Sequence, residues 1–169
     1  MKKTLIILGA GGYSRTITDI ALQSNKYNKI SYLDDCKQDN TVIGKCEDFT
    51  KFISYDVEFY PAIGDNKFRL VWIDKLLAAK ANVATFVHGT AYVSPTAFIG
   101  QGVAILPNAV VNTGCRIGDG VIVNCCSVVD HDAKVNRGAH ICPGAVVKPL
   151  NETPELIRIE PNTVFDEKK

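Results

Sequence analysis

The chain has 169 residues, of which 46% are hydrophobic and 22% charged, and its formal net charge is +1. These proportions are typical of a globular protein that can bury a core, and the length allows one medium domain or two small ones. A near-neutral charge creates no broad field that would attract nucleic acid or anionic lipid. No apolar run approaches the roughly 18 to 20 residues that span a bilayer, so no membrane-spanning helix is predicted.

The first residues, MKKTLIILGAGGYSR, share a basic tip and a short apolar run with secretory signals. The run continues into a glycine turn without a small-residue cleavage site, which favours a first strand and a cytoplasmic protein.

Six cysteines form no CxxC pair, so we predict small buried thiols rather than disulfides or a zinc site. They lie at positions 36, 46, 115, 125, 126 and 142.

Residues 1–82 predict an α/β, Rossmann-like domain. A strand, a glycine turn and a helix are expected over TLIILGAGGYSRTITDIALQS, and a second strand over KISYLDD. A short element around CEDFTKF, a strand at VEFYPAIGD and a helix over NKFRLVWIDKLLAAK follow. The predicted buried face of that helix recurs at spacings of three and four: Phe68, Val71, Trp72, Lys75 by its stem, Leu76 and Ala79. Parallel sheets of this kind bind ligands at the carboxyl ends of their strands.

A dinucleotide site is one alternative for the glycine turn. Gly9, Gly11 and Ser14 occupy the places of G-x-G-x-x-G, and Asp34 stands about twenty residues on, where a ribose-binding acid would lie. The pattern changes to hexads by Val87, however, which leaves no second nucleotide-binding half. Backbone N–H groups at a helix start suit many anionic ligands. A sugar nucleotide is therefore the favoured ligand, with NAD and a purely structural turn as alternatives.

Residues 83–169 predict an all-β solenoid. Counting in sixes from Val87 to Val147 gives eleven successive positions that are all Val or Ile, and a small residue or Val follows four positions after each of the first ten. A strict six-residue period fits neither an α-helix nor an alternating strand, but it is typical of hexapeptide solenoids. Each six would be one short strand and a turn, and three sixes one triangular coil. The β-branched residue would point inward, and the small one would let the chain turn the corner.

The segments HGTAYVSPTAFIGQGVAI and VVNTGCRIGDGVIVN resemble the left-handed parallel β-helix of hexapeptide-repeat acyltransferases. Together with GAGGYSR, YLDD, AIGDNKFR and VVDHD, they make the chain resemble the sugar O-acyltransferase family from residue 4 to about 147. That family includes sialic acid O-acetyltransferases and N-acetyltransferases of UDP-linked amino-dideoxy sugars. The resemblance implies a left-handed β-helix, a homotrimer with active sites between neighbouring prisms, and no metal. It also implies a nucleotide sugar held by the N-terminal domain and acetyl-CoA held by the β-helix.

The resemblance assigns substrate-binding roles in the N-terminal domain. Gly11, Gly12 and Tyr13 would cradle the substrate. Asp34 and Asp35 would meet the base or ribose of the nucleotide, with a solvated strand end as the alternative. In the same domain, Gly64 would allow the ligand a close approach.

Two of the three histidines lie nine residues apart in the solenoid, and both are expected to face outward. His131 lies two residues past the inward Val129, and His140 precedes the inward Ile141. By the family motif His131 is the catalytic base, Asp132 tunes its basicity, and His140 contacts the pantetheine of acetyl-CoA. A plain polar corner is the alternative for this segment.

Two further residues carry open or structural interpretations. Asn124 either lines the same cleft as His131 or is structural, and His88, at the domain junction, is interpreted as structural.

An imidazole such as that of His131, with an ordinary pKa of about 6.5, can take the proton of an attacking amine or hydroxyl near neutral pH. Direct transfer in a ternary complex then needs no covalent intermediate.

The sequence therefore predicts an acetyl-CoA-dependent acetyltransferase acting on the amino group of a nucleotide-linked amino sugar in bacterial surface glycan synthesis. A sialic acid O-acetyltransferase and an inactive sugar-nucleotide-binding scaffold are alternatives. A zinc carbonic anhydrase is disfavoured, because His131 and His140 are nine rather than five residues apart. The hexads are expected to stop after Val147, with a loop and one last hexad at 159–164. Pro149, where relatives tend to have glycine, has no N–H to offer an oxyanion.

Overall fold

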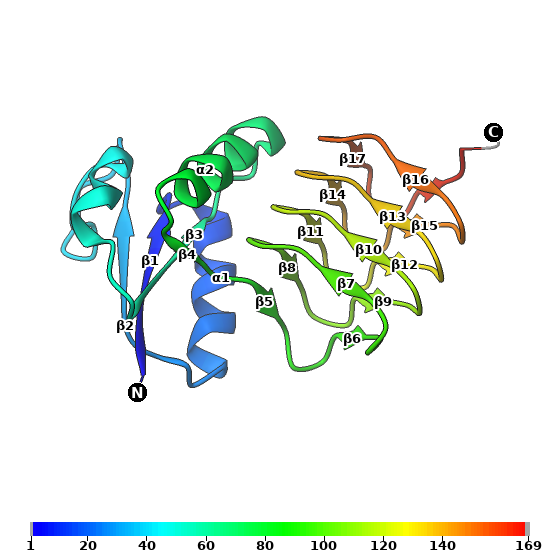
Figure 1. Ribbon diagram of the computed structural model, residues 1–169, viewed down its shortest axis with the longest axis horizontal. Helices are drawn as coiled ribbons and strands as arrows, with labels where there is room; N and C mark the ends of the chain where they lie inside the picture. The colour runs from blue at the N-terminus through cyan, green and yellow to red at the C-terminus, as the bar shows by residue number, and fades with distance from the viewer. Residues whose placement is uncertain (1, 168–169) are drawn as a thin grey trace. The chain divides into compact units, whose positions relative to one another are not determined.

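The computed structural model describes residues 2–167, and the chain divides between Ala84 and Thr85 into two compact units. The first is an α/β unit with a parallel sheet in the order β2-β1-β3-β4 (Figure 1), which confirms the predicted Rossmann-like fold. Its elements are β1 (Lys3–Leu8), α1 (Gly12–Gln23), β2 (Tyr27–Leu33), the 3-10 helix η1 (Cys46–Phe52), β3 (Val57–Pro61), α2 (Asn66–Ala78) and β4 (Asn82–Val83). None of the helices in the described range is long and apolar enough to cross a membrane.

The central strand β1 is covered on both faces, because side chains alternate along a strand. Ile6 and Leu8 pack with Leu33 and Phe59 of the flanking strands, and η1 and α2 close this core. On the other side of β3, Tyr60 contacts Tyr13 of α1, with ring centroids 6.3 Å apart. Both faces are therefore apolar, as a sheet enclosed by helices requires.

The predicted buried face of α2 is confirmed at Leu76, and Trp72 and Ala79 pack partly buried against the core, but the prediction is wrong at Phe68 and Val71. Phe68 is 64% exposed and Val71 43% exposed, whereas the buried residues are Arg69, Leu70, Ile73 and Leu76. The guanidinium of Arg69 donates to the carbonyl oxygens of Ile63 and Gly64 and to Oδ1 of Asn66, so a charged residue satisfies its donors inside the unit. The buried face of α2 therefore includes Arg69, and Phe68 lies outside it.

The second unit is a left-handed parallel β-helix, as predicted, built from two-residue strands that stack in three parallel sheets (Figure 1). Strands three apart in sequence pair in register, Val123 with Ile105 below and Ile141 above, so one coil is 18 residues. The strands are β5 (Phe86–Val87), β6 (Tyr92–Val93), β7 (Phe98–Ile99), β8 (Ala104–Ile105), β9 (Val110–Val111), β10 (Arg116–Ile117), β11 (Ile122–Val123), β12 (Val128–Val129), β13 (Lys134–Val135), β14 (His140–Ile141), β15 (Val146–Val147), β16 (Glu152–Thr153), β17 (Arg158–Ile159) and β18 (Val164–Phe165).

The interior of the β-helix uses two positions of every hexad. The Val or Ile of each strand from Ile105 to Val147 is buried, and so is the residue four positions later, from Val103 to Ala145. The small residues therefore pack inside the prism and are part of the core. Val87, the first residue of the repeat, is 47% exposed because β5 is the edge strand of its sheet.

Each corner contains one residue with positive φ, three positions after the inward residue, in every hexad from Gly102 to Asn162. Five of these residues are glycine, which adopts the left-handed region freely. Other L-residues lose roughly 1–2 kcal/mol there, with Asn and Asp the most tolerant. The non-glycine members are Asn108, Cys126, Asp132, Leu150, Leu156 and Asn162.

The prediction that the hexads stop after Val147 is wrong. Strands β16, β17 and β18 continue in phase, and no loop interrupts them. Thr153 takes the inward position with no exposed surface, and its hydroxyl oxygen accepts a hydrogen bond from the N–H of Asn136. A threonine has the β-branched shape of valine, so it preserves the strand while hiding the repeat from a search for Val and Ile.

Candidate active site

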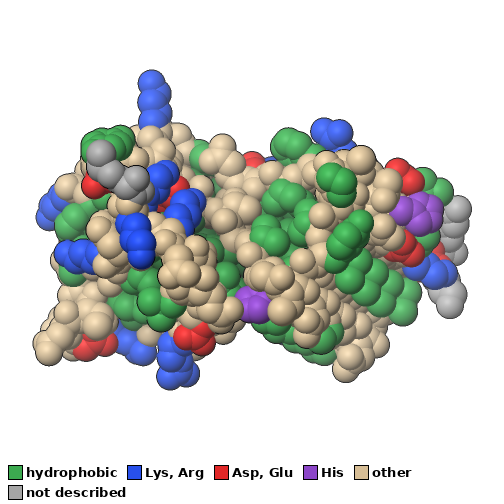
Figure 2. Space-filling view, turned by 90° about the horizontal axis from the view of Figure 1, so that it is seen from below, with side chains coloured by type: hydrophobic (Ala, Val, Ile, Leu, Met, Phe, Trp, Pro, Cys, Tyr) green, Lys and Arg blue, Asp and Glu red, His purple; other side chains and the backbone are tan. Residues whose placement is uncertain are grey.

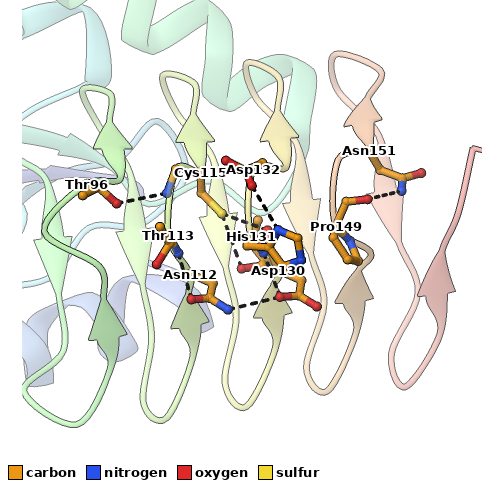
Figure 3. Close-up of polar contacts among 11 residues, drawn as sticks. Thr96, Asn112, Thr113, Cys115, Asp130, His131, Asp132, Pro149 and Asn151 are labelled. Carbon is orange, nitrogen blue, oxygen red and sulfur yellow. Dashed lines mark hydrogen bonds and ion pairs between the residues drawn. The ribbon is translucent and has the colours of Figure 1, made fainter.

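The imidazole of His131 lies on the corner between β12 and β13 (Figure 3). Its side chain is 50% exposed, so both prediction and structure place it outside the prism. Nδ1 lies 3.0 Å from Oδ2 of Asp132. Among the described residues no hydrogen-bond partner is found at Nε2, so that nitrogen is available to a substrate.

The carboxylate of Asp132 is fixed by the backbone of the preceding coil. Asp132 has φ +58°, and its N–H donates to the carbonyl oxygen of Thr113 at 2.8 Å. Its Oδ1 lies over Gly114, where a side chain on that residue would collide with it. Gly114, itself at φ +71°, therefore makes room for the acid that holds His131.

Asp130 supports the same corner and was not predicted. Its Oδ1 accepts from the N–H of His131 at 2.7 Å and from Nδ2 of Asn112 at 3.1 Å. The buried thiol of Cys115 donates to the carbonyl oxygen of Asp130 at 3.0 Å (Figure 3). Burial raises the pKa of this thiol, so it remains a protonated donor. The 18-residue coil could have revealed the Asn112–Asp130 pair, because it places these two residues one above the other.

His140, on β14, lies beside Asn124, at the corner that follows β11. Nδ2 of Asn124 is 2.9 Å from Nε2 of His140, and the guanidinium of Arg158 lies 3.4 Å from Nδ1. The Asn124 corner precedes β12 and the His131 corner follows it. Within one chain, Asn124 and His131 therefore lie at opposite ends of β12. The sequence analysis also overlooked Arg158.

In the first unit, the glycine turn is held close to β3. Gly9 has φ +94°, and a Cβ there would lie 3.2 Å from the carbonyl oxygen of Ala62, so this position requires glycine. Open space surrounds Gly11, and only the end of the Arg15 side chain comes near Gly12. Gly11 is the N-cap of α1, and backbone N–H groups at the start of a helix suit an anion.

Tyr13 follows this turn, but its side chain is already engaged. Its hydroxyl is 2.8 Å from the hydroxyl of Tyr60. Burial raises the pKa of Tyr13 well above its usual value and that of Tyr60 to about 12, so both hydroxyls stay neutral. Tyr13 can therefore offer a ligand its backbone more readily than its phenol.

The carboxylate of Asp34 ties the end of β2 to the glycine turn. Oδ2 accepts from the N–H of Ala10 at 2.6 Å, and Oδ1 from the N–H groups of Cys36 and Lys37 at 2.9 and 2.7 Å. Burial alone would raise the pKa of Asp34, but the hydrogen bonds from Lys37, Cys36 and Ala10 outweigh it and lower the pKa. Oδ1 of Asp35 accepts from the N–H of Cys46 at 3.0 Å.

A cavity of about 490 Å³ lies beside these two acids. A smaller hollow of about 230 Å³ reaches the helix start at Ser14 and Arg15. The lysines at 37 and 45, which the sequence analysis did not single out, add positive charge to the larger cavity. Its lining residues are Asp34, Asp35, Lys37, Gln38, Asp39, Asn40, Val42, Gly44, Lys45 and Asp48.

Gly64 and the cysteines complete the predicted set. Gly64 is exposed, with open space where a side chain would stand, and its carbonyl oxygen accepts a hydrogen bond from Arg69.

All six cysteines are free, but only three are buried. The expectation of buried thiols therefore fails at the exposed Cys36 and Cys126 and at the partly exposed Cys125. Over residues 2–167 no cluster of three or more His, Cys, Asp or Glu side chains could hold a metal ion.

Comparison with known proteins gives two family matches. Residues 4–76 match the PglD N-terminal domain, and residues 96–131 match the bacterial transferase hexapeptide family with six repeats.

Several solved structures share both units. The acetyltransferase domain of PglB from Neisseria gonorrhoeae is 32% identical, with a TM-score of 0.92 over 96% of this chain and 82% of that one. The same domain in complex with acetyl coenzyme A is also 32% identical, with a TM-score of 0.91 over 97% and 82% of the two chains. A mutant of perosamine N-acetyltransferase from Caulobacter crescentus, in complex with CoA and GDP-perosamine, is 22% identical, with a TM-score of 0.85 over 95% and 81%.

An α/β domain followed by a hexapeptide β-helix defines this chain as an acyltransferase of the hexapeptide-repeat class. The identity to the PglB domain extends over most of both chains. The chain therefore belongs to the sugar acyltransferase family that contains the PglB acetyltransferase domain.

Proposed function

We propose that this enzyme transfers the acetyl group of acetyl-CoA to the amino group of a nucleotide-linked amino sugar in bacterial surface glycan synthesis. The observation that carries the proposal is the pairing of the half-exposed His131 with Asp132 at 3.0 Å. The family supports it, because solved relatives bind acetyl coenzyme A or both CoA and GDP-perosamine. The six free cysteines fit a reducing compartment, so the proposed location is the cytoplasm.

In the proposed mechanism, His131 is a general base. The amino nitrogen of the sugar attacks the thioester carbonyl carbon and loses a proton to Nε2 as the new bond forms. Asp132 fixes the orientation of the ring and stabilises the imidazolium through Nδ1. The carbon–sulfur bond then breaks, and the proton passes from Nε2 to the departing thiolate. Both substrates are bound together, so proximity supplies much of the rate.

We place the nucleotide part of the sugar substrate in the N-terminal unit. The open N–H groups at the start of α1 suit the diphosphate, and the 490 Å³ cavity beside Asp35 accepts the nucleoside. Since both oxygens of Asp34 already bind the backbone, Asp35 is the more available of the two acids for a ribose or base contact.

The working form is proposed to be a homotrimer. The sheet β18-β15-β12-β9-β6 carries only apolar side chains on its outer face, which we call the valine face: Tyr92, Val110, Val128, Val146 and Val164. Figure 2 shows hydrophobic side chains gathered along the β-helical unit on the side seen there. Exposed apolar patches of this kind mark interaction sites.

A trimer formed through the valine face would also complete the active site. The His131 corner lies at one edge of that sheet, and the corner with Asn124 lies at the other. Rotation about a three-fold axis brings one edge of each copy against the opposite edge of the next. Asn124 and His140 of a neighbouring copy would then stand beside His131, where His140 could contact the pantetheine of acetyl-CoA.

The decisive experiment measures thiol release from acetyl-CoA with a panel of UDP-, dTDP-, GDP- and CMP-sugars. Wild type is expected to release thiol with at least one amino sugar, and His131→Ala to lower the rate by about 10²–10⁴. His88→Ala serves as a matched control, because the imidazole of His88 hydrogen-bonds to the N–H and the hydroxyl of its neighbour Thr90 and has no place in the proposed mechanism.

Three outcomes would contradict the proposal. Turnover that survives His131→Ala would remove the mechanism. Nucleotide-sugar binding without any thiol release would favour an inactive scaffold, and selective release with a hydroxyl acceptor such as CMP-linked sialic acid would favour O-acetylation.

A further inference from the structure

The corner that follows β15 presents an exposed leucine in a strained backbone. Leu150 has φ +63°, a region that leucine rarely adopts, and the residue is 72% exposed. It lies outside the buried core of the β-helix. Neither packing nor backbone preference therefore explains a leucine at this position, whereas chains often store such strain at functional sites.

Three features hold the corner rigidly in this shape. The ring of Pro149 restricts its own φ. Nδ2 of Asn151, a buried side chain, donates to the carbonyl oxygen of Pro149 at 3.0 Å (Figure 3). The N–H of Leu150 donates to the carbonyl oxygen of His131 at 3.2 Å. Strain persists only where the surroundings fix it, and here they do.

The last of these bonds also places the leucine next to the proposed catalytic base. Leu150 stands one 18-residue coil above Asp132, and Pro149 stands one coil above His131. A fixed backbone thus presents the apolar leucine side chain at the edge of the polar corner formed by Asp130, His131 and Asp132. A thioester has apolar carbons on both sides of its reacting group. A contact with the Leu150 side chain would remove part of their surface from water, which is favourable.

We propose that Leu150 is a specificity-determining contact for the acyl donor, packing against the apolar carbons beside the thioester while His131 faces the acceptor. The inference rests on the proposed function, since it assumes that acetyl-CoA binds at this corner. The inference adds Leu150 to the proposed active site. Neither the packing of the fold nor the pair of His131 and Asp132 explains a leucine there.

The test uses Leu150→Asn, because this chain already contains asparagine at the same left-handed corner position in Asn108 and Asn162. The variant relieves strain and keeps the backbone shape, so the melting temperature should stay equal or rise. Leu156→Asn is the matched control, since Leu156 has φ +59° at a corner with no histidine. Calorimetric binding of CoA and the KM for acetyl-CoA are measured for wild type and both variants.

Leu150→Asn is expected to weaken CoA binding and raise the KM for acetyl-CoA by about fivefold, the loss of roughly one buried methylene or slightly more. The KM for the nucleotide sugar should not change, and Leu156→Asn should behave as wild type. CoA affinity within twofold of wild type in Leu150→Asn would overturn the proposal, as would an equal loss in Leu156→Asn or dissociation of the oligomer. If wild type binds CoA in a Leu150-dependent way but never releases thiol, the proposed function fails and this inference stands.

Discussion

Oδ1 of Asp132 occupies the space that a side chain on Gly114 would fill, one coil below. Gly114→Ala should therefore lower the free energy of unfolding by about 2 kcal/mol, through left-handed strain and the collision. It should also move Asp132 and reduce kcat. Gly144→Ala is the control, because Gly144 meets Oδ1 of Asn162 in the same way at φ +68°. Equal loss of activity in both variants, measured at a temperature where both are folded, would argue against a specific role for Gly114.

Asp132→Asn removes the charge next to His131 while preserving the corner. Asparagine accepts a positive φ as readily as aspartate does, so unfolding should be unchanged within about 0.5 kcal/mol. We expect kcat to fall by about tenfold or more, because the imidazolium loses its stabilising carboxylate. Steady-state kinetics on the folded variant check this, and an unchanged kcat would show that Asp132 serves only the corner geometry.

Asp34→Asn should weaken binding of the nucleotide sugar. An amide has one acceptor oxygen, so it cannot accept from Ala10 on one side and from Cys36 and Lys37 on the other. The glycine turn should loosen, and the KM for the nucleotide sugar should rise by about tenfold, with the KM for acetyl-CoA unchanged. If both constants rise together, the effect is not confined to the nucleotide-sugar site.

Val128→Glu should disrupt the proposed trimer. Val128 lies in the middle of the valine face, and burying a carboxylate against an apolar partner is strongly unfavourable. Light scattering should show smaller species and activity should fall with them. Phe98→Glu is the control, since Phe98 is also exposed, at 58%, but lies on another sheet beside Arg116. A trimer that survives Val128→Glu would place the interface elsewhere.

Glu58 should make the fold sensitive to acid. Its side chain, only 8% exposed, accepts from Lys3 and Lys26 at 2.7 Å and from Tyr27 at 2.6 Å. Burial opposes ionisation, but these partners outweigh it and lower the pKa of Glu58. A lowered pKa contributes stability that is complete above the ordinary glutamate value of about 4.3 and is lost as the pH falls through the folded-state value.

The matching variant is Glu58→Gln. It should be less stable than wild type by about 2–3 kcal/mol at pH 7, with the difference narrowing below about pH 4. Denaturant unfolding across this range is the measurement, and a difference independent of pH would contradict the assignment.

The order of elements in both units could be predicted from the sequence, because glycine turns and hexads are local patterns. The last coils could not, since Thr153 and Asn151 replace the apolar residues that define the repeat. The predicted face of α2 was wrong in part for a related reason. Arg69 is buried by hydrogen bonds to carbonyls of a loop, and no periodicity in hydrophobicity reveals such bonds.

Some features of the candidate site could likewise be predicted from the sequence, and others could not. The outward position of His131 followed from the count of six, and its acid was adjacent in sequence. The tie between Asp34 and Ala10 required the three-dimensional closeness of two strand ends, which sequence alone does not give. The Asn112–Asp130 pair could have been found from the 18-residue coil, but the contact between the Cys115 thiol and the carbonyl oxygen of Asp130 depends on side-chain packing inside the prism, which the sequence does not show.

The 18-residue register has a consequence for how such a chain can change over evolution. Inserting or deleting one whole coil of the β-helix leaves the direction of every remaining side chain unchanged. Inserting or deleting a single residue would instead move the buried side chains of the following strands to the outside. Natural variation in this unit is thus expected in multiples of 18 residues, which would lengthen or shorten the β-helix beside the proposed acetyl-donor site without disturbing the proposed proton acceptor.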